Sequence, residues 1–281
     1  MRSAAAMTER VGRVLIIAGS DSGGGAGIQA DIKTVTALGG YAATAVTAVT
    51  VQNTLGVSGV HPIPIEVIGA QARAVLDDIG ADAIKTGMLA TAQTVELAAR
   101  LIADAGVAAV VDPVMVAKGG AVLLEAGAVE AVRRALAPLA ALLTPNAPEA
   151  EALTGISVNS LDGQRRAGAA LLALGCRAVL VKGGHLPGDS VVDLLLTGDG
   201  EALFESARIE TRHTHGTGCT LASACAVGLA QGLPLIEAVE RARNYTLEAI
   251  RRAPGLGGGH GPLDHGWPLR AAAEQLRRPD R

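Results

Sequence analysis

The sequence is poor in aromatic residues: among its 281 residues there are one Phe, one Trp and two Tyr. Basic residues are also in deficit, because 24 Lys and Arg stand against 27 Asp and Glu, for a formal net charge of −3. Single-stranded nucleic acid is bound through basic grooves and aromatic stacking, and anionic membranes attract basic surfaces. We therefore expect neither nucleic acid nor a membrane as a partner.

Long apolar runs and paired cysteines are missing as well. The stretch 34–65 contains no Asp, Glu, Lys or Arg, but polar residues and two Pro interrupt it, whereas a membrane helix needs about 20 predominantly apolar residues. The three cysteines are odd in number and lack metal-ligand spacing, which argues for a reducing compartment. Residues 1–12 contain no apolar segment of the kind found in signal peptides. We expect a cytoplasmic protein with a frayed tail over 1–12 and a single domain over 13–281.

Short β-branched apolar runs alternate along the chain with segments in which apolar residues recur at helical spacing. The first pair is a strand over 13–19 and a helix over about 25–38. Further strands are expected over 42–51, 83–86, 107–114, 139–143 and 177–181, further helices over about 65–77, 91–103, 128–136, 161–174 and 235–252, and a hairpin over 190–195 and 202–209. This alternation predicts an α/β fold with a mostly parallel sheet, in which ligands bind beyond the carboxyl ends of the strands.

The stretch His215-Gly-Thr-Gly-Cys-Thr220 leads directly into an apolar, Ala-rich helix. Gly216, Thr217 and Gly218 therefore fall where a loop becomes a helix and where backbone N–H groups are free. A helix N-terminus carries about half a positive charge, and its free amides bind phosphate oxygens. An isolated Gly-x-Gly can also be only a turn and a helix cap, but a second glycine-rich segment, 19–27, favours an anion site.

Cys219 stands at the mouth of this expected anion site, in the first turn of the helix. The helix dipole should lower the pKa of its thiol from about 8.5 toward neutrality. A thiolate there could act as a general base. The alternative is that Cys219 packs against a ligand as a small hydrophobic residue.

Charged residues follow several of the predicted strands. Asp112 and Glu149 are candidates to hold Mg²⁺, which takes one or two carboxylates together with substrate phosphates; each could instead form a salt bridge or support a helix start that Asn146 or Ala147 caps. Lys182 precedes two glycines and can reach a phosphate as a point charge, or can be an exposed lysine. With the anion site, these residues indicate phosphoryl transfer.

Two familiar nucleotide-binding motifs are absent. The glycines after the first strand lack the GxGxxG spacing, and no acidic residue closes a second strand about 20 positions further on, so a Rossmann dinucleotide site is excluded. The sequence also contains no GxxxxGK[ST] and no protein-kinase motif set.

Four segments taken together resemble the hydroxymethylpyrimidine/phosphomethylpyrimidine kinase family of thiamine biosynthesis, a branch of the ribokinase-like superfamily. They are 18–31, 144–149, 182–185 and 215–220, and the tail 259–265 also resembles this branch, where it lies near the nucleotide. Cys219 stands where the sugar kinases of the superfamily carry a catalytic Asp, and the pyrimidine-kinase branch has this cysteine. Asn146 and Glu149 are similar to the magnesium motif NxxE of the superfamily.

The resemblance implies a ribokinase-like three-layer α/β/α fold with no separate lid domain. It implies ATP- and Mg²⁺-dependent phosphorylation of 4-amino-5-hydroxymethyl-2-methylpyrimidine, and then of the monophosphate to the diphosphate; we also expect a homodimer. Residues and resemblance together predict Gly216, Thr217, Gly218, Cys219 and Lys182 as catalytic, Lys182, Thr217 and Asn146 as nucleotide-binding, Asp112 and Glu149 as metal-binding, and Gly19, Asp31, Gln52 and Met88 as pyrimidine-binding.

Some alternatives stay open at this point. Gln52 suits an aminopyrimidine because its amide offers both a donor and an acceptor, but it could also face water, and Met88 could belong to the core. A pyridoxal kinase, which uses the same fold on a similar hydroxymethylated ring, and a non-catalytic ligand-binding protein are the rival functions. Asp21 could only cap its loop, His215 could be structural, and Lys118 could contact the nucleotide or be exposed.

Overall fold

A computed structural model describes residues 11–116, 120 and 123–270. The predicted tail over 1–12 therefore lies outside the described residues except for its last two. Gly12 is already part of the fold, because its carbonyl oxygen accepts a hydrogen bond from the backbone N–H of Tyr41 at 2.9 Å.

A nine-stranded sheet runs through the described part of the chain in the order β3-β2-β1-β4-β5-β6-β7-β8-β9. The parallel strands are β1 (Arg13–Ser20), β2 (Tyr41–Asn53), β4 (Ala83–Thr86), β5 (Ala108–Val111), β6 (Leu142–Leu143) and β7 (Ala178–Val181), and the antiparallel strands are β3 (Gly56–Pro62), β8 (Ser190–Thr197) and β9 (Gly200–Ala207). The predicted α/β fold, the mostly parallel sheet and the β8–β9 hairpin are confirmed.

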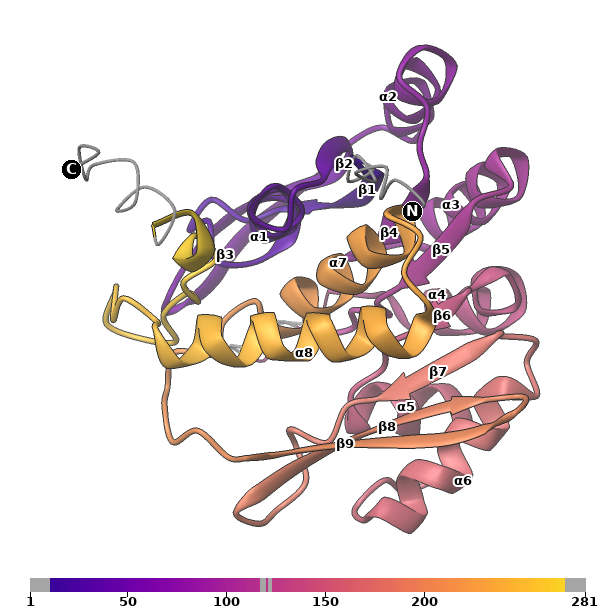
Figure 1. Ribbon diagram of the computed structural model, residues 1–281. Coiled ribbons are helices and arrows are strands. Elements are labelled where there is room, and N and C mark those ends of the chain that lie inside the picture. The colour runs from indigo at the N-terminus through magenta and orange to yellow at the C-terminus, as the bar shows by residue number, and fades with distance from the viewer. Residues whose placement is uncertain (1–10, 117–119, 121–122, 271–281) are drawn as a thin grey trace, which may run out of the picture.

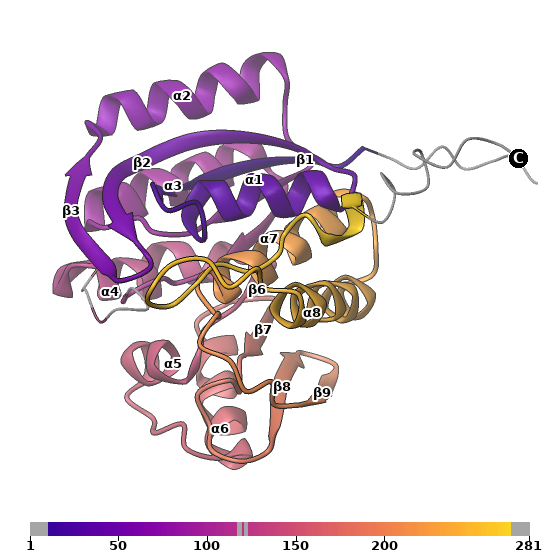
Figure 2. The ribbon, with the colours of Figure 1, turned by 90° about the vertical axis from the view of Figure 1, so that its left-hand side faces the viewer.

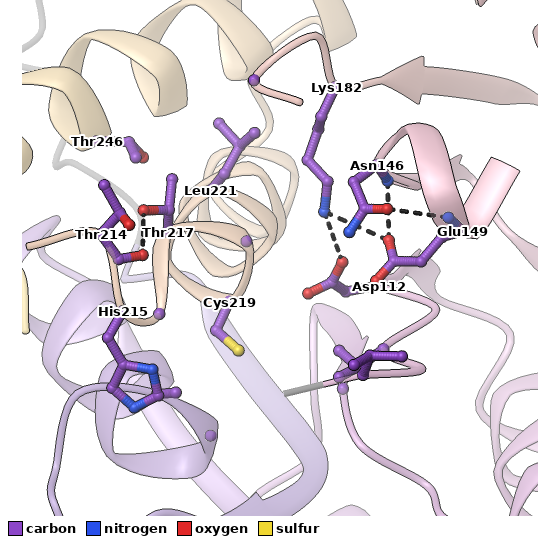
Figure 3. Close-up of a pocket in the computed structure, with 18 of the residues that line it drawn as sticks. Asp112, Asn146, Glu149, Lys182, Thr214, His215, Thr217, Cys219, Leu221 and Thr246 are labelled. Carbon is purple, nitrogen blue, oxygen red and sulfur yellow. Dashed lines mark hydrogen bonds and ion pairs between the residues drawn. The ribbon is translucent and has the colours of Figure 1, made fainter. Parts of the chain in front are cut away.

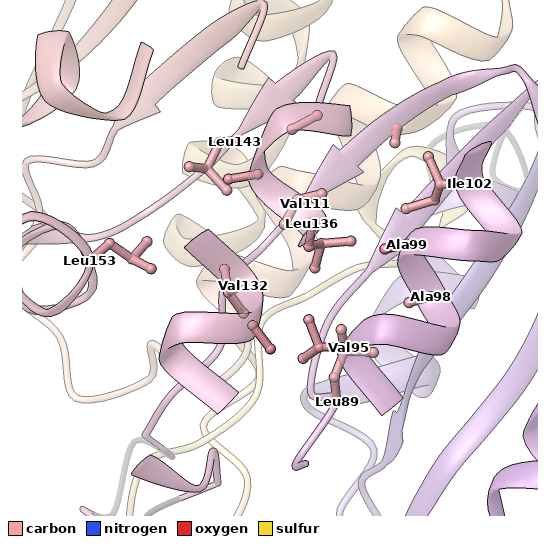
Figure 4. Close-up of a cluster of buried hydrophobic side chains, with 14 of the residues drawn as sticks. Leu89, Val95, Ala98, Ala99, Ile102, Val111, Val132, Leu136, Leu143 and Leu153 are labelled. Carbon is pink, nitrogen blue, oxygen red and sulfur yellow. The ribbon is translucent and has the colours of Figure 1, made fainter. Parts of the chain in front are cut away.

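Helices cover both faces of this sheet, which makes three layers (Figures 1 and 2). One face carries α1 (Gly27–Ala37), α7 (Thr217–Ala230) and α8 (Leu235–Arg251), and the other carries α2 (Ile65–Asp78), α3 (Ala92–Ala105), α4 (Ala126–Ala131), α5 (Ala147–Thr154) and α6 (Leu161–Leu172). Alternate residues of β1 serve the two faces: Leu15 and Ile17 enter the core under α2–α6, and Val14 and Ile16 enter the core under α1, α7 and α8. Figure 4 shows part of the first core, where α3 packs over the central strands.

The helix α7 carries apolar residues on nearly every side, which is typical of a helix that other elements surround. It packs against α1, α8 and the strands β4 and β5, and Gly228 allows α8 to approach so closely that an added Cβ would lie 2.9 Å from that of Ala238. This packing holds the N-terminus of α7 at the carboxyl edge of the parallel strands.

The structure departs from the predictions at one unpredicted strand and at two predicted elements. Strand β3 was not predicted, because 56–62 is rich in Gly and polar residues and pairs only as an exposed edge. The helix expected over 128–136 is α4 followed by a π-helical turn over Val132–Leu136 and a 3₁₀ turn over Ala137–Leu139. Because this last turn contains Pro138, the strand expected over 139–143 is reduced to the two residues of β6.

None of the helices in 11–116 and 123–270 combines the length and the apolar character that crossing a membrane requires. The cytoplasmic location stays a prediction.

Candidate active site

A cleft of about 820 Å³ opens at the carboxyl ends of the parallel strands, beside the N-terminus of α7 (Figure 3). The predicted site residues lie there with one exception, Asp31. Those that line the cleft are Gly19, Gln52, Met88, Asp112, Asn146, Glu149, Lys182, Gly216, Thr217, Gly218 and Cys219. Residues from β1, β2, β4, β5 and β7 meet because parallel strands present their carboxyl ends at one edge.

The first turn of α7 has the geometry of an anion site. Gly216 precedes the helix with a φ of 84°, and a Cβ at this position would collide with the carbonyl oxygen of Gly25. The amides of Thr217 and Thr220 bond to Thr214 and Gly216. Among the described residues, the amides of Gly218 and Cys219 make no backbone hydrogen bond, which leaves them available to a ligand.

An ion pair faces this helix start. The Nζ atom of Lys182 lies 3.0 Å from Oδ1 of Asp112 and 3.9 Å from Oε2 of Glu149. A Cβ added to Gly218 would lie 3.2 Å from the same Nζ and 3.5 Å from Oδ2 of Asp112. The free amides of α7, one ammonium group and two carboxylates therefore share one end of the cleft (Figure 3).

Asn146 and Glu149 form a reciprocal cap at the start of α5. The backbone N–H of Glu149 donates to Oδ1 of Asn146 at 2.9 Å, and the backbone N–H of Asn146 donates to Oε2 of Glu149 at 2.8 Å. The capping role considered for Asn146 is thus present, while the Nδ2 end of its amide is not used by the cap. Burial raises the pKa of Glu149 to about 7, against the opposing effect of Lys182 and with a contribution from Asp112.

Cys219 does not have the lowered pKa expected from the helix dipole. Burial raises the pKa of its thiol to about 12, and although Lys85 and the N–H of Gly27 oppose this, Asp31 and Asp112 add to it. The prediction was wrong because desolvation at the floor of the cleft outweighs a helix dipole.

Asp31 lies beneath the cleft and does not line it. Both of its carboxylate oxygens accept hydrogen bonds from Nζ of Lys85, at 2.8 and 2.9 Å, and one also accepts the hydroxyl of Ser223 at 2.7 Å. All three side chains are fully buried. The placement of Asp31 against the pyrimidine is therefore corrected: its acceptors are committed to Lys85 and Ser223.

Lys85 is a site residue that sequence reasoning missed. It lies in β4 at the floor of the cleft, covered by Gly87, and a Cβ added to Gly87 would lie 3.0 Å from Nζ of Lys85. Burial opposes its charge, but Asp31, then Cys219 and Asp112, raise the pKa of Lys85 above its ordinary value. A lysine inside an apolar parallel strand was the available signal, because such charges are buried only when paired.

Asp21 organises the first glycine-rich loop. Its carboxylate accepts hydrogen bonds from the backbone N–H groups of Gly23, Gly25 and Ala26 at 2.8–3.0 Å, and Nε2 of His215 lies 2.9 Å from its Oδ2. Burial favours the neutral acid, but the hydrogen bonds from His215 and Ala26 prevail and hold the pKa of Asp21 below its ordinary value. Asp21 is a loop cap and His215 ties that loop to α7, while Lys118 lies outside the described residues.

The other end of the cleft is an apolar slot between the β8–β9 hairpin and α8. Its walls include Val191, Ala207, Ile209, Leu247 and Ile250. Beneath it, Nε of Arg243 lies 2.7 Å from Oδ2 of Asp193, whose Oδ1 accepts the N–H of Gly183 at 2.8 Å. Sequence reasoning missed this pair, because the two residues are 50 positions apart and carry no motif.

The tail segment lies across the opposite side of the cleft. Its backbone N–H groups at Gly259 and His260 donate to Oγ1 and O of Thr54, at 3.3 and 2.8 Å, and the carbonyl of Gly261 accepts the N–H of His215 at 3.2 Å. The tail is thus fastened to the end of β2 and to the residue before the anion site.

Comparison with known proteins gives consistent matches. The family model for phosphomethylpyrimidine kinase matches residues 21–264. A hydroxymethylpyrimidine/phosphomethylpyrimidine kinase of Streptomyces coelicolor is 54% identical over 91% of this chain and 95% of its own length. A bifunctional thiamine biosynthesis protein of Geobacter sulfurreducens is 54% identical over 90% of this chain and 52% of its own length. The structure of a Bacillus subtilis pyridoxal kinase in complex with ADP has a TM-score of 0.86 at 39% identity, over 93% of this chain and 99% of that one.

Proposed function

This chain belongs to the phosphomethylpyrimidine kinase family, and we propose on this basis that it transfers phosphate from ATP to 4-amino-5-hydroxymethyl-2-methylpyrimidine and then to the monophosphate. The product of the two steps is the pyrimidine diphosphate of thiamine biosynthesis. The observation that carries the proposal is the position of the α7 anion site and Lys182 between a polar pocket around Gln52 and an apolar slot. A donor and an acceptor bound in these two places would meet at the anion site.

The pyrimidine occupies the end of the cleft formed by Gly19, Gln52 and Met88. Met88 is buried, and its side chain packs beside Gly19: a Cβ added to Gly19 would lie 3.0 Å from Sδ of Met88. The absence of a side chain at Gly19 therefore leaves a flat wall on which an aromatic ring can lie. Gln52 supplies the polar edge that the amino group and the adjacent ring nitrogen need.

The phosphates of ATP lie at the N-terminus of α7. The free amides of Gly218 and Cys219 stabilise the charge on the transferred group, and Lys182 adds a full positive charge. Burial alone would lower the pKa of Lys182, but Asp112 and Glu149 raise it above its ordinary value, so the side chain remains an ammonium group. The apolar slot at Val191, Leu247 and Ile250 suits the base of the nucleotide.

Asp112 and Glu149 fit a Mg²⁺ ion that is completed by phosphate oxygens and water. Both are oxygen donors, both face Lys182, and no group of three or more His, Cys, Asp or Glu among the described residues offers a closed metal site. The ion would screen the charge of the phosphates. The two carboxylates would hold it, and Asn146 would orient Glu149 through the cap.

A coupled assay of ADP release tests the function. Turnover is expected with the pyrimidine alcohol and with its monophosphate, in each case only when ATP is present. Absence of turnover with both pyrimidines in a folded preparation would overturn the assignment.

Pyridoxal phosphorylation is the second candidate activity, and the close superposition on a pyridoxal kinase favours including it. The identity of 39% to that kinase is lower than the 54% to the pyrimidine kinase. The discriminating measurement is kcat/KM for pyridoxal and for the pyrimidine alcohol in one preparation. We expect the pyrimidine to have the higher value.

We also propose a homodimer that uses the outer face of the β2–β3 ribbon. Val49 and Val51 lie two residues apart on β2 and are 46% and 63% exposed, and Tyr41 on the same strand is 48% exposed. Exposed apolar side chains on an edge ribbon of a sheet suit a contact with another chain. Light scattering should give twice the monomer mass, and the variant Val51→Glu should give the monomer.

A further inference from the structure

The amide of Gln52 lies between two polar groups from different segments. Its Nε2 is 3.2 Å from Nε2 of His215, and its Oε1 is 3.2 Å from Oγ1 of Thr50. The two ends of a glutamine amide have nearly the same shape, and their hydrogen-bond partners decide which end is which. Each of the two neighbours carries information about this choice.

Thr50 requires a donor from Gln52. The hydroxyl of Thr50 has a single proton, and the carbonyl oxygen of Ser20, which can only accept, lies 2.8 Å from Oγ1. The hydroxyl of Thr50 therefore donates its proton to the carbonyl oxygen of Ser20, because this contact is shorter than the 3.2 Å contact with Gln52 and a carbonyl oxygen can only accept. Oγ1 then offers only lone pairs to Gln52, so the amide end that faces it must be the NH₂ group.

His215 requires an acceptor from Gln52. Asp21 is ionised, because it already accepts backbone N–H groups from Gly23, Gly25 and Ala26 and has a lowered pKa. A carboxylate oxygen 2.9 Å from Nε2 of His215 needs a proton on that nitrogen. Nε2 therefore has no lone pair for an NH₂ group. Its one proton is donated mainly to Asp21 at 2.9 Å, and the amide end of Gln52 at 3.2 Å meets this N–H favourably only if it is the oxygen.

We propose that the amide of Gln52 is oriented with Oε1 toward His215 and Nε2 toward Thr50, and that the pairs Asp21–His215 and Ser20–Thr50 are the positioning elements that hold it so. The two arguments are independent, because one rests on a hydroxyl and the other on an imidazole from a segment 163 residues away. This inference rests on the proposed function, in which Gln52 contacts the pyrimidine.

The orientation of the Gln52 amide determines which of its atoms forms a hydrogen bond with each polar group of the substrate ring. Oε1 accepts the 4-amino group, and the second proton of Nε2 is donated to the neighbouring ring nitrogen. The hydroxymethyl group is bonded to the ring carbon next to the one that carries the amino group. It therefore lies on the His215 side, and His215 directly precedes Gly216 and the anion site.

A ring that carries an oxo group at this place and a protonated neighbouring nitrogen is rejected. Its oxygen would face Oε1 and its N–H would face the NH₂ group, so both contacts would be repulsive. A site built to form a hydrogen bond discriminates strongly against a ligand that leaves its polar groups unpaired. Asp21 and His215 thus act on specificity without touching the substrate.

Nuclear magnetic resonance on the uniformly ¹⁵N,¹³C-labelled full chain tests the orientation directly. We expect nuclear Overhauser effects from the side-chain amide protons of Gln52 to the β and γ protons of Thr50, and ¹⁵N shifts of His215 that report a protonated Nε2. Nuclear Overhauser effects from the Gln52 amide protons to the ring protons of His215, together with ¹⁵N shifts of an unprotonated Nε2, would overturn the proposal. No substitution is needed, so folding of a variant does not limit this test.

The consequence for specificity is tested with two ligands, the 4-amino substrate and its 4-oxo analogue. In the unchanged protein, the KM of the analogue should be at least about tenfold higher. The variant His215→Phe should reduce this ratio and leave KM for MgATP unchanged, and His215→Gln, which retains a donor, should restore part of it. An unchanged ratio in a folded His215→Phe protein contradicts the positioning role.

The outcomes separate this inference from the proposed function. If the protein does not phosphorylate the pyrimidine at all, the function is wrong, whereas the resonance experiment still decides the orientation of Gln52. If turnover is normal and the amide is oriented the other way, the function stands and the inference alone fails.

Discussion

The ammonium group of Lys85 lies 2.8 and 2.9 Å from the two carboxylate oxygens of Asp31, and both side chains are fully buried beneath the cleft. Lys85 comes from β4 and Asp31 from α1. Removing one partner leaves the other as an uncompensated buried charge, which is far more costly than removing both.

Asp31→Asn should therefore lower the free energy of unfolding by about 3–5 kcal/mol, and the double variant Asp31→Asn/Lys85→Met should recover part of this loss. The measurement is urea unfolding followed by circular dichroism. The matched control is Arg165→Ala, which breaks an exposed ion pair with Glu201 and should cost less than about 1 kcal/mol. A loss of similar size in the control and in Asp31→Asn would contradict the role of the buried pair.

Gly218→Val should lower kcat for both phosphorylations by a factor of about 100 or more, since losing a donor to the transferred group costs this much in comparable sites. An added Cβ already lies 3.2 Å from Nζ of Lys182, so the larger side chain intrudes between the free amides and the ammonium group. Gly198→Ala is the control, because no atom lies within 4 Å of a Cβ there. Unchanged kcat in folded Gly218→Val would remove this helix start from the mechanism.

Glu149→Gln should raise the Mg²⁺ concentration that gives half-maximal activity, because it removes one of two carboxylates available to the ion. Glutamine retains the acceptor for the N–H of Asn146, so the cap of α5 and hence the fold should persist. The measurement is turnover at fixed ATP over a Mg²⁺ titration, with Glu205→Gln on the exposed strand β9 as the control. An identical Mg²⁺ dependence would exclude Glu149 as a ligand.

Glu149 should also make the free energy of unfolding fall between pH 4.5 and 7. Burial raises its pKa from the ordinary 4.5 to about 7, although Lys182 opposes the shift. In this interval the folded protein retains a proton that the unfolded chain has released, so a rise in pH favours unfolding. Unfolding by urea at a series of pH values should show a flatter profile in Glu149→Gln than in the unchanged protein, and equal slopes would refute the raised pKa.

Cys219→Ala should slow the phosphorylation of the alcohol and of the monophosphate by similar factors. With a pKa of about 12, the thiol is protonated near neutral pH and cannot take up the proton of the alcohol. A thiolate acting as a general base, one of the two roles considered from the sequence, would instead give a larger loss in the alcohol step. Turnover of both substrates at saturating MgATP decides between them, and a loss at least about tenfold larger for the alcohol would restore the general base.

The family match and the position of most site residues were accessible from the sequence. Gly19, Gln52, Asp112 and Lys182 each follow an apolar run, and in a parallel sheet the carboxyl ends of the strands converge without any further information. The glycines before α7 likewise predicted free amides, because the start of a helix leaves its first N–H groups unpaired whatever the rest of the chain does. The ADP complex of a structural neighbour supports the predicted use of ATP.

Tertiary structure alone decided how these groups are charged and oriented. The sequence predicted Asp31 at the ligand and Cys219 as a thiolate. Asp31 is instead committed to Lys85, 54 positions away, and burial raises the pKa of the Cys219 thiol even though Lys85 opposes this. The orientation of Gln52 depends in the same way on His215. Sequence patterns report local backbone preferences and the edge at which a side chain emerges, whereas pKa values and hydrogen-bond partners are set by segments that only the folded chain brings together.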